Sequence, residues 1–150
     1  MMKTCLLLLV MNMFNQFIPI QTNAVSNSDI IKMYLKAKEK IMQQDATVED
    51  IEKVIHFYSD TLYYEHVLSA EKKFLFHGKD DLRSGYISHL GETGNAKITV
   101  LNLIEKQNIV IVEYSSKREI ISNHKTEESQ IVSLYEFDNN GKIKHMVDYL

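Results

Sequence analysis

Cysteine and proline are nearly absent from this sequence. Among its 150 residues there is one of each, Cys5 and Pro19, and both stand within the first two dozen positions. From position 25 onward the chain can form no disulfide bond of its own and offers no cysteine as a metal ligand. Burial of apolar side chains therefore has to stabilise whatever this part of the chain folds into.

Motifs that mark several other functions are missing as well. No basic stretch interleaves with aromatic residues, which argues against nucleic acid as a partner. The six histidines show no His-x-x-x-His or Cys/His spacing, and the chain has no glycine-rich phosphate loop and no Gly-x-Ser-x-Gly elbow. We therefore expect no metal ion and no cofactor.

The first 24 residues have the order of a secretory signal peptide. A short basic start at Lys3 precedes the apolar run 5–10, and a small-x-small sequence at 22–24 ends the segment. Asn12 interrupts the apolar stretch, which is too short to span a bilayer, since a span needs about 20 apolar residues. We expect cleavage after Ala24 and secretion to an extracellular or periplasmic location, with no membrane attachment afterwards.

Apolar residues at helical spacing predict three helices in the first half of the remaining chain. Ser26 offers an N-terminal cap for the first helix, and Thr47 with Asp50 three residues later resembles a capping box for the second. Gly91 suits the C-terminal end of the third. The expected helices cover about 30–43, 48–58 and 82–90.

Strand patterns follow from the alternation of apolar and polar residues. A first strand at 61–66 is expected to pair with a short piece at 74–76. Asn140-Gly141 has the hairpin chemistry that favours positive φ, and the other late connections are short too, which predicts an antiparallel meander. The four expected late strands cover about 96–105, 108–121, 127–137 and 142–149.

Helices followed by a long antiparallel sheet indicate an α+β fold, with a single domain from 25 to 150. The expected strands exceed the usual length of about 5–6 residues, so the sheet must curve strongly. A curved sheet covered on one side by three helices encloses a conical hollow, where a ligand would bind.

Three segments together resemble the NTF2-like superfamily and, within it, the SnoaL-like domains. They are 57–66, with Tyr64-Glu65-His66 at its end, 77–83 and 135–143. The resemblance implies a cone of three helices on a curved sheet, a pocket at the wide end and frequent dimerisation. It implies no single activity, because the superfamily includes isomerases, cyclases, dehydratases, epoxide hydrolases and members that only bind or oligomerise. The epoxide hydrolases need an arginine between two aspartates, which Arg83 and Arg118 support poorly.

His66, Tyr64 and Glu113 are the candidate catalytic residues. In isomerase and cyclase relatives an aspartate commonly follows the glutamate of the first strand, and His66 takes that place after Glu65. A histidine can remove a proton from the carbon next to a carbonyl group, and Tyr64 can donate a hydrogen bond to the enolate. Glu113, if buried among aliphatic residues, would stay protonated as a donor, whereas a bulge would turn it to water. Each also has a purely structural alternative.

Tyr34, Tyr58, His89 and Asp148 are the candidates for ligand contacts. The two tyrosines would pack in the core or line a pocket. His89 lies on the apolar stripe of the third expected helix, and with His66 it would form the two-histidine arrangement of dehydratase relatives. Asp148, near the end of the last strand, is either buried in the hollow or turned to water.

Two strands are apolar on both faces, at 100–104 apart from Asn102 and at 109–112. One face can cover the helices, while the other needs a partner or becomes an exposed apolar patch. We therefore expect a homodimer formed through the sheet. For function we expect a pocket for a small, mostly apolar molecule and isomerase-, cyclase- or dehydratase-type proton transfer. The alternative is a non-catalytic extracellular matrix or assembly protein that uses the fold for dimerisation or ligand storage.

Overall fold

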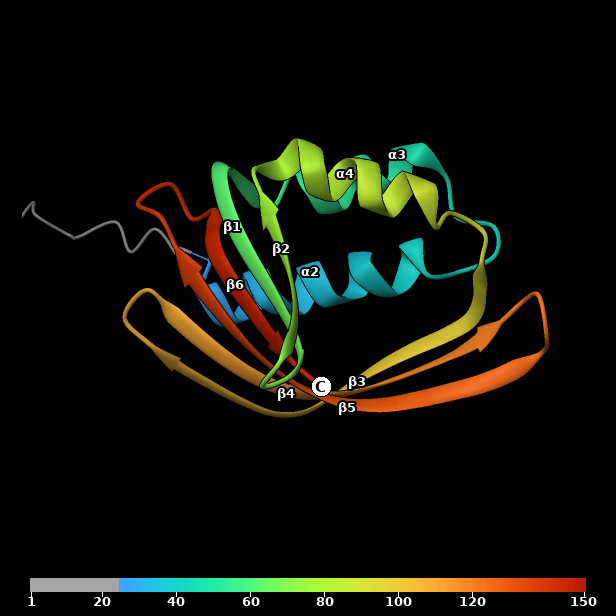
Figure 1. Cartoon of the computed structure of the whole chain (residues 1–150). Coiled ribbons are helices and arrows are strands. Elements are labelled where there is room, and N and C mark those ends of the chain that lie inside the picture. The colour runs from blue at the N-terminus through green and yellow to red at the C-terminus, as the bar shows by residue number, and fades with distance from the viewer. Residues whose placement is uncertain (1–24) are drawn as a thin grey trace, which may run out of the picture.

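The computed structural model describes residues 25–150, so the expected signal peptide and its cleavage after Ala24 lie outside the described residues. Three helices lie on the concave side of one curved six-stranded sheet (Figure 1), which is the α+β architecture that the sequence predicts. The elements are α2 Asn27–Ile41, α3 Val48–Ile55, β1 Tyr58–Ser69, β2 Lys72–His77, α4 Lys79–Ser88, β3 Thr93–Lys106, β4 Ile109–Ile120, β5 Lys125–Phe137 and β6 Ile143–Tyr149.

The first two helices begin at the caps that the sequence offers. The Ser26 side chain accepts a hydrogen bond from the backbone N–H of Asp29, and Thr47 and Asp50 form a reciprocal capping box. The second helix ends at Ile55, three residues earlier than expected. Tyr58 is buried as predicted, but as the first residue of β1, because one buried position fits helical and strand spacing equally well.

The strands lie in the order β2-β1-β6-β5-β4-β3, and β3 to β6 form the expected meander. Gly141, in the connection from β5 to β6, has φ +71°, as the Asn-Gly pair predicts. One pairing departs from the antiparallel pattern, since β1 and β6 run parallel. The chain passes through β2, α4 and three further strands before β6 enters beside β1, and such a crossover is what parallel pairing requires.

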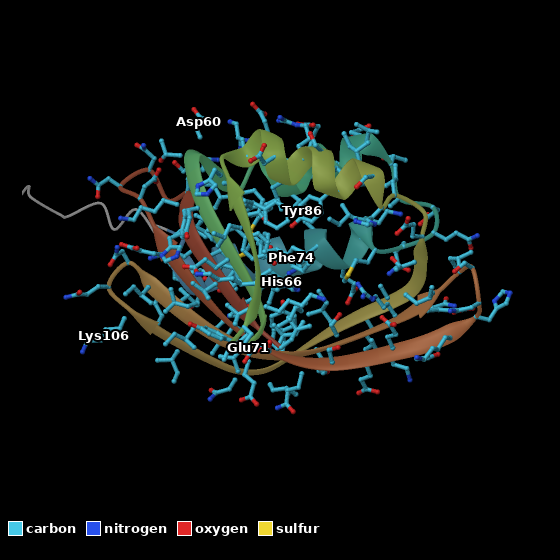
Figure 2. The ribbon with its side chains drawn as sticks, viewed as in Figure 1. Asp60, His66, Glu71, Phe74, Tyr86 and Lys106 are labelled. Carbon is cyan, nitrogen blue, oxygen red and sulfur yellow. The ribbon has the colours of Figure 1, made fainter. Side chains whose placement is uncertain are left out.

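Strand alternation divides the sheet into an inner face toward the helices and an outer face. On β4, Val110, Val112 and Tyr114 are buried on the inner face, whereas Ile109 and Ile111 are exposed on the outer face. Figure 2 shows His66, from the inner face of β1, in the space between the helices and the sheet. No helix within residues 25–150 is long and apolar enough to cross a membrane.

Candidate functional site

A cavity of about 920 Å³ lies between the helices and the inner face of the sheet, in the place where the curved sheet was expected to leave a hollow. Its volume falls within the range of about 300–1,000 Å³ that is typical of small-molecule sites. Its apolar wall comes mainly from α2, β2, α4, β3 and β5, and comprises Ile41, Met42, Phe74, Phe76, Leu82, Tyr86, Ile98 and Ile131. Polar side chains also line the cavity, and those of Lys38, Tyr64, His66, Tyr114 and Asp148 belong to one network.

Asp148 on β6 is the centre of that network. It is almost wholly buried, and its carboxyl group accepts hydrogen bonds from the Tyr64 hydroxyl at 2.9 Å, the Lys38 ammonium at 3.3 Å and the Ser133 hydroxyl. Three donors aimed at one carboxyl group are the arrangement that suits a carboxylate. The buried charge is thereby matched by a cation and two hydroxyl groups, without which it would be strongly destabilising.

Lys38 brings the matching positive charge from α2. Its Nζ lies 3.3 Å from Asp148 and 3.2 Å from the hydroxyl of Tyr114, and its side chain is 16% exposed. Burial lowers the pKa of Lys38, but the Asp148 carboxylate and the neighbouring tyrosine side chains together outweigh that effect and leave the pKa well above its usual value. Lys38 is therefore an ammonium ion at neutral pH. Two of its three N–H groups are used by these partners, and no other residue among 25–150 accepts a hydrogen bond from the third.

Tyr64 and His66 continue the network along β1. The Tyr64 hydroxyl lies 2.9 Å from Nδ1 of His66 and donates its single proton to Asp148. Burial raises the pKa of Tyr64 far above its usual value, so the hydroxyl stays protonated. Since that proton is directed to the carboxylate, Nδ1 of His66 has to be the donor to the Tyr64 oxygen. Nε2 of the neutral ring then carries the free lone pair.

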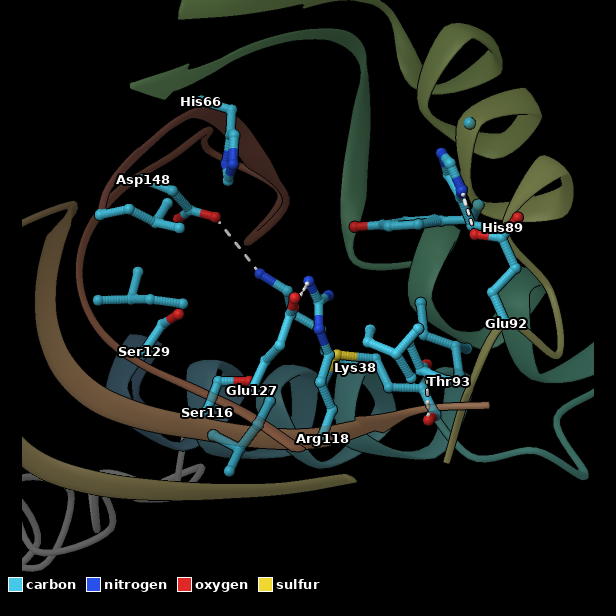
Figure 3. A pocket seen from close by; sticks show the side chains of 18 of the residues that line it. Lys38, His66, His89, Glu92, Thr93, Ser116, Arg118, Glu127, Ser129 and Asp148 are labelled. Carbon is cyan, nitrogen blue, oxygen red and sulfur yellow. Dashed lines mark hydrogen bonds and ion pairs between the residues drawn. The ribbon is translucent and has the colours of Figure 1, made fainter. Parts of the chain in front are cut away.

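His66 stays neutral because of where it lies. Burial lowers the pKa of His66; the negative charge of Asp148 opposes this, and the positive charges of Lys38 and Arg118 reinforce it. The residue is half-buried in the cavity wall, and Nε2 forms no hydrogen bond to any residue between 25 and 150. Figure 3 shows His66 beside Asp148 on one side of the cavity, with His89 and Glu92 on the other.

Three of the predicted site residues therefore converge: His66, Tyr64 and Asp148. Two others do not line the cavity but pack behind it. Tyr34 is fully buried in the core, and Tyr58 donates a hydrogen bond to the Tyr34 hydroxyl at 2.9 Å. The expected role of these two tyrosines as direct ligand contacts is not supported by their positions.

The expectations for Glu113 and His89 need correction. Glu113 follows Ile109 and Ile111 on the outer face of β4, where it accepts a hydrogen bond from Gln130, so it is not a buried acid in the cavity. His89 is not on a buried stripe, because α4 ends at Ser88 and the His89 side chain is 74% exposed. It stands at the rim of the cavity, 2.7 Å from Glu92.

Sequence reasoning missed Lys38, Ser133 and Tyr114. The signal for Lys38 was present, since Ile31, Leu35 and Lys38 follow helical spacing and place the lysine on the buried stripe. Ser133 likewise alternates with buried residues of β5. The available clue was a polar side chain at a position where the helical or strand period predicts an apolar one.

Within residues 25–150, no group of three histidine or acidic side chains is arranged to hold a metal ion.

Comparison with known proteins places this geometry in a known fold. The model of the SnoaL-like domain matches residues 45–146. A solved LEH-like epoxide hydrolase of Mycobacterium tuberculosis is 19% identical, with a TM-score of 0.61 over 81% of this chain and 82% of that one. An NTF2-like protein of unknown function from Burkholderia pseudomallei K96243 is 15% identical, with a TM-score of 0.64 over 81% and 88%. At these identities the two structures show a shared fold only. The search of curated proteins gave no match.

Proposed function

The chain belongs to the SnoaL-like domain family, and from this premise we propose that it is an enzyme that moves a proton within a small, mostly apolar carbonyl compound. The observation that carries the proposal is the hydrogen-bonded series Asp148–Tyr64–His66 in the wall of the cavity. The series supplies a base of defined tautomer, and burial keeps that base neutral, which are the two properties that proton abstraction from carbon requires.

The proposed reaction begins with Nε2 of His66. It takes a proton from the carbon next to the substrate carbonyl, and the electrons of that C–H bond move onto the carbonyl oxygen to form an enolate. The remaining N–H of Lys38 stabilises the oxygen, and Asp148 stabilises the imidazolium through Tyr64. Nε2 then returns its proton to the same or a conjugated carbon, so the net change is an exchange or an isomerisation.

Epoxide opening is less well supported by the cavity. Among the residues of 25–150 that line it, Asp148 is the only aspartate, and the cation beside Asp148 is a lysine. Arg83 lies outside the cavity and pairs with Glu52 and Asp80, while Arg118 pairs with Glu127. An arginine held between two aspartates is therefore not found in the cavity wall. The likeness to the M. tuberculosis structure therefore supports the fold of this chain, but it does not support epoxide hydrolysis as its reaction.

Deuterium exchange at simple ketones tests the proposal, because the reaction needs only a C–H bond next to a carbonyl group. The full chain is incubated in D₂O with 2-octanone and, separately, with 9-oxodecanoate, and loss of the protons next to the ketone is followed by NMR. We expect the protein to accelerate exchange and His66→Gln to lower the rate by about 100-fold or more. His56→Gln, at an exposed histidine after α3, is the matched control and should leave the rate unchanged.

Exchange at the uncatalysed rate with both ketones would refute the proposal and favour the second candidate, a non-catalytic assembly or ligand-storage role. The outer face of the sheet supports that candidate. Exposed apolar side chains cross it from strand to strand, namely Ile104, Ile111, Val132 and Tyr149.

We propose that this outer face joins two copies of the chain, whichever function applies. Charges of both signs, such as Glu65 and Lys73, border the patch, so it can face a second copy of itself across a two-fold axis. Sedimentation at micromolar concentration should give a dimer, and Ile111→Lys with Val132→Lys should give a monomer. A wild-type monomer would contradict the proposal.

Secretion stays a proposal that rests on the first 24 residues. If the chain is expressed with these residues in a host that recognises secretory signals, the protein outside the cytosol should begin at Val25. An intact N-terminus on protein retained in the cytosol would contradict it.

A further inference from the structure

The cavity holds a second charged pair, at some distance from Asp148. Arg118 on β4 and Glu127 on β5 lie opposite each other in the strand register, and both line the cavity. Strand alternation from the buried Tyr114 through Ser116 places Arg118 on the inner face. Figure 3 shows the arginine and its partner among the cavity side chains. The side chains of this pair bond to each other and to none of the groups that react in the proposed mechanism, and they take no part in the packing of the core.

Most of the hydrogen-bonding capacity of Arg118 is unused. Nη2 donates one hydrogen bond to Oε2 of Glu127 at 3.1 Å, and no other residue among 25–150 accepts a hydrogen bond from the guanidinium group. A guanidinium has five N–H donors in a planar fork that matches a carboxylate in a bidentate manner. The two side chains are 44% and 43% exposed, so their ion pair is weak and leaves the arginine available to a ligand.

The two polar regions lie on the same strand of the cavity wall. Tyr114, the hydroxyl partner of Lys38, stands four residues before Arg118 on β4, and a rise of roughly 3.3 Å per residue separates their Cα atoms by about 13 Å. Ser116 and its β5 partner Ser129 line the wall between them, with Ile98 and Ile131 beside the two serines. A ligand that touches both regions needs one polar group for each and a chain that joins the two groups.

We infer that Arg118 binds the carboxylate of the substrate and thereby selects straight-chain oxo acids, whose ketone reaches His66. The partner that the guanidinium holds is itself a carboxylate, that of Glu127, so the substrate group takes over or shares this place. The inference rests on the proposed function, because the ketone end is assigned by the reaction at His66. Arg118 acts here as a specificity-determining residue that contacts the substrate away from the reacting atoms.

Calorimetry with a matched acid and ester tests this directly. The ligands are 9-oxodecanoate, methyl 9-oxodecanoate and, as a second anion, decyl phosphate. We expect the wild type to bind the acid at least about tenfold more tightly than the ester, and Arg118→Gln to abolish the preference. Glu127→Gln removes the competing carboxylate and should tighten acid binding. Lys117→Gln, which removes a neighbouring exposed cation from the outer face, should change the binding of neither the acid nor the ester.

Each outcome decides the matter. Equal binding of acid and ester by the wild type, or an undiminished preference in Arg118→Gln, overturns the inference. If Glu127→Gln weakened binding of the acid as much as Arg118→Gln does, the two residues would form a structural pair and the inference would be wrong. If decyl phosphate bound more tightly than the acid, the arginine would belong to a phosphate site instead. In the exchange assay, Arg118→Gln should raise the KM for the acid alone, whereas failure of the proposed function would remove exchange for acid and ester alike.

Discussion

Two ion pairs line the same cavity and differ in almost every physical respect. Lys38–Asp148 is buried, joins residues far apart in the sequence, and is supplemented by hydroxyl groups. Arg118–Glu127 is half-exposed, joins neighbouring strands, and is made by a single hydrogen bond. A charge that has lost its water is held firmly by its partners, while a hydrated one exchanges partners easily. The buried pair is thus suited to orienting catalytic groups, and the exposed pair to receiving a ligand.

Removing one charge from the buried pair should have the largest effect. Lys38→Met leaves Asp148 buried without its cation, and we expect a loss of about 3–5 kcal/mol in the free energy of unfolding, measured by urea denaturation. Lys36→Met, on the exposed side of the same helix, is the control and should change stability little. The double variant Lys38→Met with Asp148→Asn should recover part of the loss. A loss below about 1 kcal/mol in Lys38→Met would erase the contrast between the two pairs.

Breaking the series at its middle should reduce activity while the fold persists. Tyr64→Phe removes the hydroxyl that links Asp148 to His66, so the ring loses its fixed tautomer and orientation. We expect exchange to slow by about 10- to 100-fold, which is the effect of removing the residue that orients a metal-bound histidine in other proteins. Binding of methyl 9-oxodecanoate should persist. Tyr63→Phe, on the other face of β1, should keep the full rate. If Tyr64→Phe matched wild type, Asp148 would have no part in orienting His66.

The pH dependence of exchange sharpens the description of the buried region. The base is the neutral form of His66, which exists above its pKa, and burial lowers that pKa below the ordinary value of about 6.5. The rate should therefore remain high through pH 6.5 and decline only in more acidic solution. A pH–rate profile whose acid limb has its midpoint at or above about 6.5 would contradict the assignment.

The exposed pair should contribute least to stability. Arg118→Gln and Glu127→Gln should each change the free energy of unfolding by less than about 1 kcal/mol, and a double-mutant cycle should give a coupling energy of similar or smaller size. Higher salt should weaken that coupling further. A coupling near that of a buried pair would mean that Arg118 is locked in the fold, and it would leave no donors for a substrate.

The fold could be predicted because its signals are local. The caps at Ser26 and Thr47, the helical spacing and the Asn-Gly turn each act over a few residues, and the structure contains them at the expected places. The boundary at Tyr58 was wrong because a single buried position does not distinguish a helix from a strand. His89 was misplaced because α4 ends one residue before it.

The site was only partly predictable, because the face of a strand that meets the helices is decided by pairing between residues far apart in the sequence. The run 109–112 is apolar on both faces, so alternation alone could not tell which side of β4 meets the helices, and Glu113 was assigned to the wrong one. In the structure Tyr114, Ser116 and Arg118 share the inner face, which leaves Glu113 outside. Lys38 and Asp148 are 110 positions apart, and no local sequence pattern predicts that they form an ion pair. His66 and Tyr64 were found because both lie on one strand.

The place of β6 between β1 and β5 has a consequence for how the molecule comes apart. The β1–β2 hairpin and the three-stranded unit β3–β5 share no ladder of their own and are joined in the sheet only through this strand. Release of β6 would separate the sheet into two independent pieces and open the cavity at the same moment. Amide protons of β6 should therefore exchange with solvent only when the whole domain unfolds, while those of the flanking edge strands exchange through smaller openings.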